Sequence, residues 1–571
     1  LQFLKPTFSR PYLIADYLYF LYNGGGDKNM NINYYDNPFS SKRMNIIARN
    51  GVVCTGNNLA TQAGLRMLQA GGNAVDAAIA TAACLTVVEP CSNGLGSDGF
   101  AIVWMKDKMY GMNSSGHSPY LISADKINEI PKRGWIPVTV PGAVKGWKAL
   151  SDRFGSLPFK QLLEPAIDYA KNGYPVSPEI ARMWKKAISA IPNSDEFKGW
   201  YDTFTFEGKT PEPGQFIRMP KLADALEKIA NTNTDALYYG ELADRIDEES
   251  RKFGGFLRKK DLMDHVAEWV EPIHVDYHGY QVWELPPNGQ GIVALMALNI
   301  LNNFNFESRN AECVHTQMEA LKMAFADAKE YVTDPQCMNV SVDDLISVEY
   351  GKQRAKQITS CALPPCVDKP HGSGTVYLCT ADKDGNMVSY IQSNYMGFGS
   401  GIVVDGISLQ NRGYDFSLNP NHVNYLMPHK KTYHTIIPGF LTKDNKPVGP
   451  FGVMGGYMQP QGHMQVVTNM IDFHLNPQMA LDAKRFQWVE NMKFIVEPGF
   501  DENIISELKK RGHEIEIEPE LAMFGPPAVK MLSHADLLKR IHRTCKKPVF
   551  SLLRQMSKAR RCQKKRGCIL L

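Results

Sequence analysis

Apolar residues recur every three or four positions in several stretches between residues 59 and 332, a period typical of amphipathic helices. The first stretch, 59–89, is broken at Gly71-Gly72, where Asn73 is placed to cap a second helix. That second helix carries alanines at helical spacing, which suits tight packing against a sheet. Further helices are predicted at 159–174, 219–232, 239–255 and 317–332.

After Pro370 the pattern changes to the alternation of apolar and polar residues that is typical of β-strands. Two such runs within 375–395 are joined by Asp384-Gly385, a dipeptide that favours a hairpin turn. Other strand-forming runs are 44–56, 274–287, 401–411, 434–444 and 447–456, and 503–519 predicts a helix followed by a strand. This order of helices, strands and helices favours layered sheets covered by helices over a βαβ repeat.

The composition is that of an ordered globular protein. Of 571 residues, 44% are hydrophobic and 21% are charged, which excludes a disordered chain and a collagen-like one. The net charge of +4 gives no general case for nucleic-acid binding. Between Lys530 and Arg566, however, there are 13 Lys and Arg residues and one acidic residue, so this segment has a net charge of +12. The rest of the chain therefore has a net charge of −8.

Cysteine usage and the N-terminal stretch bear on the compartment. The eleven cysteines are scattered and form no CxxC pair, so reduced thiols in a cytoplasmic protein are expected. The apolar stretch Leu13–Tyr22 contains Asp16 and is too short for a membrane span, which needs about 20 residues. We interpret 1–43 as an N-terminal extension that lies outside the working protein.

Most common catalytic motifs are missing. The chain has no GxSxG, HExxH or P-loop motif. His315 and Glu319 are one helical turn apart, but the sequence suggests no third ligand, so we expect neither a metal nor a cofactor.

The sequence Gly372-Ser373-Gly374-Thr375 ends a connector rich in Pro, Lys and Ser and leads directly into a strand. A threonine that begins a strand is ordinarily only a β-former. A small, flexible leader is also what self-cleavage requires, because the hydroxyl must reach the preceding carbonyl carbon. The freed α-amino group, with a pKa near ~7.7–8.0, could then act as the base for that hydroxyl.

Several blocks in order carry a family resemblance. They are 56–90 with SNGLGSDGFAIVW after it, then VPGAVKGW, LPPNGQG, HTQMEALKMAFADAKEYVTDP, and the segment from Gly374 to Val403. From about Asn45 to Gly525 the chain resembles the γ-glutamyltranspeptidase family of N-terminal nucleophile hydrolases. The resemblance implies an α+β fold, the four-layer αββα sandwich of that hydrolase type.

It also implies a precursor cut between Gly374 and Thr375. The products would be a large subunit, 44–374, and a small subunit, 375–525. They should remain together as a heterodimer, and two heterodimers could pair.

Roles transfer residue by residue. Thr375 matches the nucleophile, and Ser393 stands where the family has a Thr that bonds the nucleophile. Gly455 and Gly456 match the pair whose N–H groups form the oxyanion hole. Asp415 matches the acid that holds the α-amino group of the substrate.

Other positions depart from the family. Ser115 stands where γ-glutamyl enzymes have an Arg that binds the α-carboxylate, and Arg412 stands where many members have Gln. His434-Thr435 replaces a Ser-Ser pair, and Tyr395 replaces an Asn. We therefore expect Arg412 to supply the carboxylate anchor, with Asp415, Tyr395, His434 and Thr435 completing the substrate site.

Only 22 residues separate Asp415 from Pro438, so the lid loop of many members is absent. These departures resemble a lidless, glutathione-hydrolase-like subgroup, and also related acylases and an oxamate-type amidohydrolase. The expected activity is acyl transfer through Thr375 from a small acidic amide, a γ-glutamyl amide such as glutathione. The alternatives are hydrolysis of an oxamate or glutaryl amide, and an unprocessed, inactive, membrane-tethered homologue.

The tail, 526–571, is basic and we expect it to be unrelated to the family. It ends Cys568-Ile569-Leu570-Leu571, which fits a C-a-a-X prenylation box behind a polybasic run. Membrane association would follow only if that box is used. The other interpretation is an inert tail.

Overall fold

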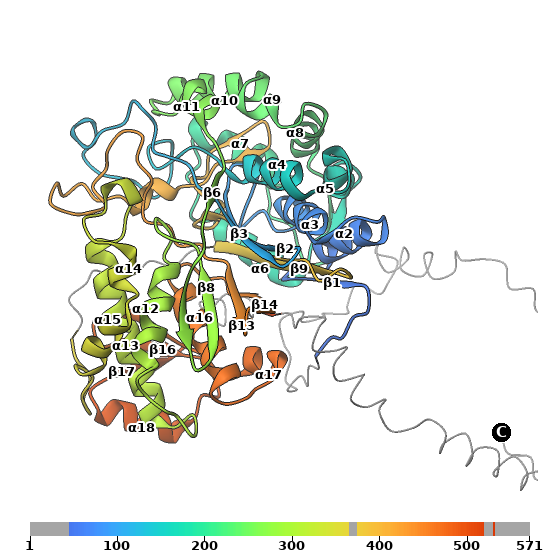
Figure 1. Ribbon diagram of the computed structural model, residues 1–571. Coiled ribbons are helices and arrows are strands. Elements are labelled where there is room, and N and C mark those ends of the chain that lie inside the picture. The colour runs from blue at the N-terminus through green and yellow to red at the C-terminus, as the bar shows by residue number, and fades with distance from the viewer. Residues whose placement is uncertain (1–44, 365–373, 519–528, 531–571) are drawn as a thin grey trace, which may run out of the picture.

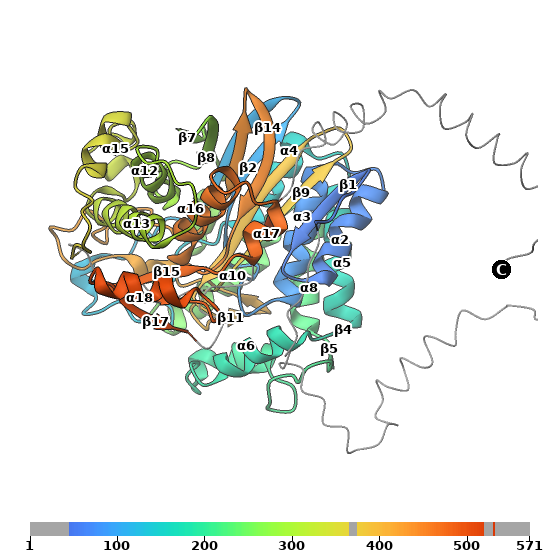
Figure 2. The ribbon, with the colours of Figure 1, turned by 90° about the horizontal axis from the view of Figure 1, so that it is seen from below.

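Two β-sheets packed face to face lie between two layers of helices (Figure 1, Figure 2). This computed structural model describes residues 45–364, 374–518 and 529–530. The N-terminal extension, the Gly372-Ser373 leader and Cys568 lie outside the described residues.

The first sheet has six antiparallel strands and contains Thr375. In spatial order they are β1 (Gly51–Thr55), β9 (Gly374–Asp382), β10 (Met387–Tyr395), β2 (Asp98–Met105), β3 (Lys108–Ser114) and β6 (Glu268–Val270). The second sheet has five: β18 (Val529–Lys530), β14 (Lys446–Gly452), β13 (Gly439–Lys443), β8 (Tyr280–Glu284) and β7 (Ile273–Tyr277). Each sheet thus combines strands from before and after Gly374.

One helical layer covers the outer face of the first sheet and consists of α2 (Asn58–Gln69), α3 (Ala74–Val88), α4 (Ala143–Phe154) and α5 (Phe159–Asn172). All fifteen residues of α3 are buried, because its small side chains let it lie close against β9 and β10. Asn73 and Asp76 form a capping box at its start, so the predicted cap is confirmed.

The other helical layer covers the second sheet and consists of α12 (Gly291–Leu301), α13 (Ala311–Tyr331), α15 (Val348–Ala355) and α16 (Met458–Ile471). The remaining helices are α6 (Pro178–Ile188), α7 (Lys198–Phe204), α8 (Pro220–Asn231), α9 (Asp235–Tyr238), α10 (Glu241–Lys252), α11 (Lys259–Asp264), α14 (Val342–Leu345), α17 (Pro477–Asp482) and α18 (Glu502–Lys510), with 3₁₀ turns η1 (Ala124–Lys126), η2 (Asp195–Phe197), η3 (Pro335–Cys337) and η4 (Arg412–Asp415). The small strands are β4 (Tyr174–Pro175), β5 (Phe216–Ile217), β11 (Val403–Val404), β12 (Ile407–Ser408), β15 (Phe486–Glu490), β16 (Lys493–Val496) and β17 (Glu514–Ile517).

Most predicted elements are present, with three differences. The helix predicted at 317–332 begins at Ala311, because the Asn310 side chain caps it. The strand predicted within 401–411 is only the β11–β12 pair. Val529 and Lys530, which lie in the predicted tail, pair with β14. Within the described residues, no helix is both long and apolar enough to span a bilayer.

Candidate active site

Thr375 lies near the start of β9, in the first sheet, and its side chain is almost fully buried, with 3% of the residue exposed. Its Oγ1 lies 3.1 Å from Oγ of Ser393 on the neighbouring strand β10. A bulge between Gln392 and Tyr395 interrupts the pairing of the two strands. Ser393 Oγ also accepts a hydrogen bond from Tyr395 N–H at 2.8 Å, so it contacts both the Thr375 hydroxyl and the backbone at the bulge.

Gly455 and Gly456 lie between strand β14 of the second sheet and helix α16, on the segment that leads to the Thr375 hydroxyl. Both have positive φ, +114° and +59°, which favours glycine, and they come directly before helix α16. Gln459, in the first turn of that helix, donates from Nε2 to Thr375 Oγ1 at 3.5 Å. The glycine pair therefore lies at a helix N-terminus whose first turn contacts the hydroxyl, a place where N–H groups and the helix dipole favour negative charge.

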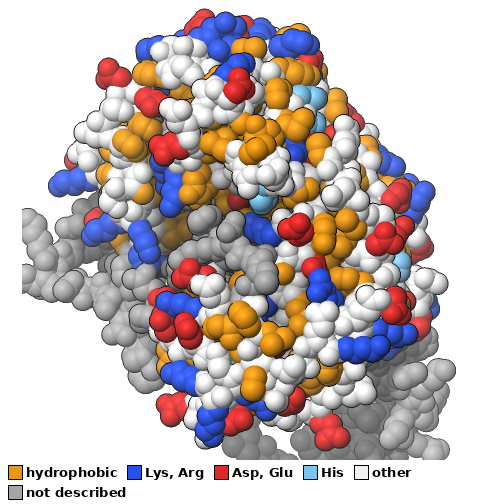
Figure 3. All heavy atoms as spheres, turned by 90° about the vertical axis from the view of Figure 1, so that its left-hand side faces the viewer, with side chains coloured by type: hydrophobic (Ala, Val, Ile, Leu, Met, Phe, Trp, Pro, Cys, Tyr) orange, Lys and Arg blue, Asp and Glu red, His pale blue; other side chains and the backbone are white. Residues whose placement is uncertain are grey.

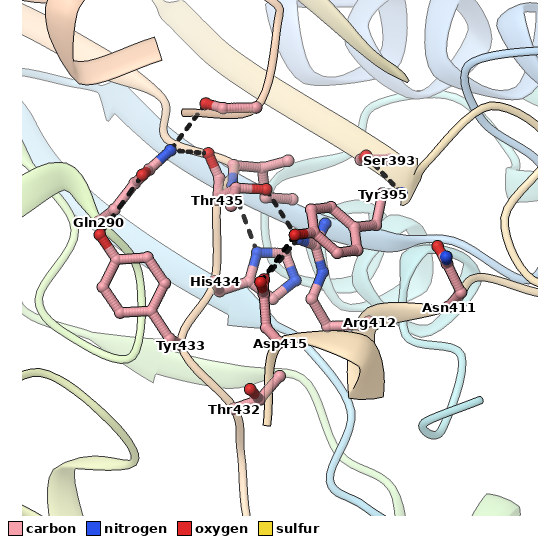
Figure 4. A network of polar contacts seen from close by, with 12 residues as sticks. Gln290, Ser393, Tyr395, Asn411, Arg412, Asp415, Thr432, Tyr433, His434 and Thr435 are labelled. Carbon is pink, nitrogen blue, oxygen red and sulfur yellow. Dashed lines mark hydrogen bonds and ion pairs between the residues drawn. The ribbon is translucent and has the colours of Figure 1, made fainter. Parts of the chain in front are cut away.

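Asp415 is held by two phenols. Its Oδ1 accepts a hydrogen bond from Tyr395 Oη at 2.7 Å (Figure 4). It accepts a second one from Tyr457 Oη at 3.1 Å. Burial and the nearby carboxylate raise the pKa of both tyrosines well above the ordinary value, so both remain donors. Asp415 Oδ2 is buried and has no hydrogen-bond partner among the described residues.

Arg412 lies beside this carboxylate and is fully buried. Its Nη1 donates to Thr435 Oγ1 at 2.7 Å and lies 3.8 Å from Asp415 Oδ2. The guanidinium plane faces the Tyr395 ring at 4.2 Å. Nε and Nη2 make no hydrogen bond within the described part of the chain. A buried guanidinium with unused N–H groups, next to a carboxylate with an unused oxygen, can bind a small polar ligand.

His434 and Asp98 form the wall behind Arg412. His434 Nε2 is 3.0 Å from Asp98 Oδ2, and its Nδ1 accepts from Ile436 N–H at 3.4 Å. Burial lowers the pKa of His434 well below its usual value, and Arg412 lowers it further, so the ring is neutral and donates from Nε2.

Asp98 is itself oriented by the first sheet. It stands opposite Ser393 in the β2–β10 pair, and its Oδ2 lies 3.9 Å from Arg412 Nε. Burial raises the pKa of Asp98 to about 7, although Arg412 opposes the shift. Asp98 therefore holds both the ring of His434 and the guanidinium in place.

Ser115 takes part in a separate set of contacts. Its hydroxyl donates to Asn113 Oδ1 at 2.7 Å and lies 3.5 Å from Asn288 Oδ1. The next residue, Gly116, donates its N–H to Asp98 Oδ1 at 3.2 Å. The Ser115 segment thus contacts the same aspartate as Arg412, but its hydroxyl is occupied by Asn113.

The structure brings the predicted residues of the two strands, the glycine pair and η4 into one region. Sequence reasoning missed several residues that organise it, namely Asp98, Gln290, Tyr457 and Gln459. Gln290 Nε2 donates to Gly456 O at 2.8 Å and to Thr435 O at 2.5 Å, and so joins two walls of the site. Gln290 lies in LPPNGQG and Asp98 in SNGLGSDGFAIVW, two of the blocks that carry the family resemblance. Their place in those blocks is the sequence signal that could have identified them. Gln459 had no signal beyond following the glycine pair.

A second buried group, on α13, involves His315 and Glu319. The structure adds His513 as a third neighbour, which the sequence did not suggest: His315 Nδ1 lies 2.8 Å from His513 Nε2. Lys322 Nζ is 2.7 Å from Glu319 Oε1 and already supplies a positive charge there. His315 Nε2 contacts Thr359 O at 2.7 Å, so the group fastens the chain 15 residues before Gly374, the predicted cleavage position.

The face shown in Figure 3 carries acidic and basic side chains interspersed with apolar ones. Among the described residues on this face, no extended patch of one sign is visible. Nucleic acid is bound by a basic patch or stripe, so this face gives it no footprint.

Replacing Ser393 by alanine is expected to slow both self-cleavage and hydrolysis roughly 10- to 100-fold. The change removes a hydrogen bond to Thr375 and leaves the buried Tyr395 N–H unpaired, a cost of about 1–3 kcal/mol. The matched variant Ser393→Thr restores the hydroxyl and should recover most of the rate. The rate of band conversion on a denaturing gel measures the first effect, and equal rates for the alanine variant and the wild type would contradict the assignment.

Known proteins with similar sequences match more than four-fifths of the chain. The glutathione hydrolase-like YwrD proenzyme of Bacillus subtilis (strain 168) is 39% identical, covering 83% of this chain and 92% of that protein. The oxamate amidohydrolase proenzyme of Klebsiella pneumoniae is 32% identical, covering 86% and 95%. Among solved structures, a cephalosporin acylase from Bacillus halodurans is 50% identical with a TM-score of 0.84, covering 87% of this chain and 96% of that one.

The structural similarity confirms the α+β fold of the N-terminal nucleophile hydrolase type. The family profile described as gamma-glutamyltranspeptidase matches residues 60–528, past the boundary expected at 525. These matches bear out the resemblance that the motifs suggested, including its class of reaction. The chain therefore belongs to the γ-glutamyltranspeptidase family of self-processing hydrolases.

Proposed function

We propose that this chain cleaves itself between Gly374 and Thr375 and then hydrolyses the amide of a small acid through Thr375. The observation that carries the proposal is the buried Thr375 hydroxyl, held between Ser393 and Gln459. The products are a large subunit ending at Gly374 and a small subunit beginning at Thr375. Because each sheet contains strands from both, they stay associated as a heterodimer.

Both reactions use the same oxygen. In self-cleavage, Thr375 Oγ1 attacks the carbonyl carbon of Gly374 and loses its proton. The C–N bond between Gly374 and Thr375 breaks, its nitrogen takes up a proton to become the α-amine, and water hydrolyses the ester that results. In catalysis, the freed α-amine of Thr375 takes the hydroxyl proton while Oγ1 attacks the substrate amide. The N–H groups of Gly455 and Gly456 stabilise the oxyanion, the departing amine takes a proton, and water then releases the acid.

The acyl group lies between Arg412 and Asp415. A γ-glutamyl group carries an ammonium and a carboxylate on one carbon. Asp415 Oδ2 has no hydrogen-bond partner among the described residues and can accept from the ammonium, and the unused N–H groups of Arg412 can bind the carboxylate. A group with both charges satisfies both side chains, so a γ-glutamyl amide such as glutathione fits best.

An oxamate or glutaryl amide is the second candidate. It is favoured by the 50% identity to a cephalosporin acylase and by the 32% identity to an oxamate amidohydrolase. Such substrates have no α-ammonium and would leave Asp415 Oδ2 unpaired. A panel of γ-glutamyl, glutaryl and oxamate amides on the processed protein separates the two, and a glutaryl preference would overturn the γ-glutamyl proposal.

Hydrolysis should exceed transfer to amino-acid or peptide acceptors. The 22 residues between Asp415 and Pro438 run as a short loop, tied by Asn424 Nδ2 to Asp415 O at 2.7 Å, so water is not excluded by a lid. Adding glycylglycine is therefore expected to change the rate of substrate loss by less than about twofold, which is a change of about 0.4 kcal/mol in barrier height. A strong acceleration would contradict this expectation.

An unprocessed, inactive homologue is the remaining alternative. A denaturing gel of the purified protein separates it, since a self-cleaving chain gives two bands. We also propose that the protein works in the cytoplasm, with membrane association only if Cys568 is prenylated.

A further inference from the structure

Two cysteines far apart in the sequence lie directly opposite each other in the first sheet. Cys54 on β1 pairs with Cys379 on β9 in the antiparallel register. Opposite residues in such a pair have Cα atoms about 4.5 or about 5.5 Å apart. Both separations lie within the span that a disulfide bridges, about 4.4–6.8 Å. Residues directly opposite each other in an antiparallel pair project from the same face of the sheet, so the two thiols lie side by side.

The two thiols differ in access. Cys54 is partly exposed, whereas Cys379 is buried. The contact with Cys379 lowers the pKa of Cys54, and burial raises the pKa of Cys379 well above the ordinary value. Cys54 therefore has the properties of an attacking thiol and Cys379 those of a resolving one. Cys84 and Cys91, by contrast, are fully buried, and burial raises the pKa of each.

The pair spans the subunit boundary. β1 precedes Gly374 and β9 follows it, and Cys379 lies four residues from Thr375 on the same face of the strand. Thr55 Oγ1 donates to Tyr377 O at 3.0 Å, which fastens β1 to β9 between the pair and the nucleophile. A bond between the two sulfurs would therefore join the subunits close to Thr375.

We propose that Cys54 and Cys379 are a redox-active pair that forms a disulfide between the two subunits. The oxidant is a small-molecule disulfide, RSSR. The Cys54 thiolate attacks one of its sulfurs, forming Cys54–S–S–R and releasing RS⁻, which takes a proton. The Cys379 sulfur, after losing its proton, attacks Cys54 and releases a second RSH. Two protein thiols lose two electrons, and RSSR is reduced to two RSH.

That the disulfide joins two chains rests on the proposed cleavage at Gly374–Thr375, whereas the disulfide itself does not. The test treats the purified full-length protein with hydroxyethyl disulfide, chosen because it contains no amide to hydrolyse, and then alkylates the remaining thiols. On a reducing gel the processed protein should give two bands. On a non-reducing gel these should shift to one band at the mass of the uncleaved chain. Peptide mass spectrometry should find Cys54 linked to Cys379, two hydrogens lighter than the free peptides.

Two variants control the result. Cys54→Ser should lose the shift, whereas Cys337→Ser, which removes another exposed thiol, should keep it. A shift that persists in Cys54→Ser, or the absence of the linked peptide from the oxidised wild type, would overturn the proposal. One band on the reducing gel would instead refute self-cleavage, while the linked peptide would still decide the disulfide.

Discussion

Replacing Thr375 by alanine is expected to leave a single intact chain of 64.0 kDa with no hydrolase activity. The hydroxyl that the change removes is the oxygen that attacks in self-cleavage and in catalysis, so both should be lost together. Without cleavage the α-amino group of residue 375 also stays in a peptide bond and cannot act as a base. The loss in rate should exceed about 10³-fold, as for other removed nucleophiles.

A matched variant on the same strand distinguishes chemistry from folding. Thr380 also lies on β9, and its Oγ1 donates to Ala74 O at 2.6 Å, away from the site. Thr380→Ala removes an equivalent hydroxyl and should still give two bands. N-terminal sequencing of the small subunit completes the experiment, because a start anywhere other than Thr375 would refute the cleavage site.

Replacing Arg412 by lysine should raise KM for an acidic substrate about 10- to 100-fold while self-cleavage continues. Lysine keeps the charge but replaces a planar fork with a point donor, which loses about 1.5–3 kcal/mol of charge-assisted hydrogen bonding. Processing does not use this group, since the peptide bond at Gly374 carries no carboxylate. The measurements are KM and kcat on the processed variant, and the gel assay of cleavage.

Arg133→Lys is the matched control. Arg133 donates to the main-chain oxygens of Gly397 and Gly399 and lies outside the proposed acyl pocket. It should leave KM unchanged. If KM for every acidic substrate stays at the wild-type value in Arg412→Lys, then Arg412 is not the anchor.

Much of the fold could be predicted because its information is local. The capping box at Asn73 and the Asp384-Gly385 turn each depend on residues that are close together in the sequence, and the structure contains both. The boundaries were less predictable: α13 begins at Ala311 because the side chain of Asn310 caps it, which periodicity does not register.

The candidate site also contains both residues that the sequence could identify and residues that it could not. Thr375 could be predicted as the nucleophile because the resemblance of the surrounding blocks to the family assigns that role to it, and the small leader before it suits self-cleavage. Gln459 and Asp98 could not be assigned, because their roles arise from contacts with residues 84 and 314 positions away. His513 likewise meets His315 across 198 residues, a distance at which spacing carries no information.

The sequence alone predicts the main helices and strands, the faces they bury, the family, and the residue types available for chemistry. That Asp98 and His434 support Arg412, and that Cys54 faces Cys379, follows only from the folded arrangement of the chain. Periodicity identifies the buried face of each strand, but a strand can bury that face beside any of several partners. The choice among them depends on long loops closing so that both sheets and both helical layers bury their apolar surfaces at once, which is a property of the whole chain.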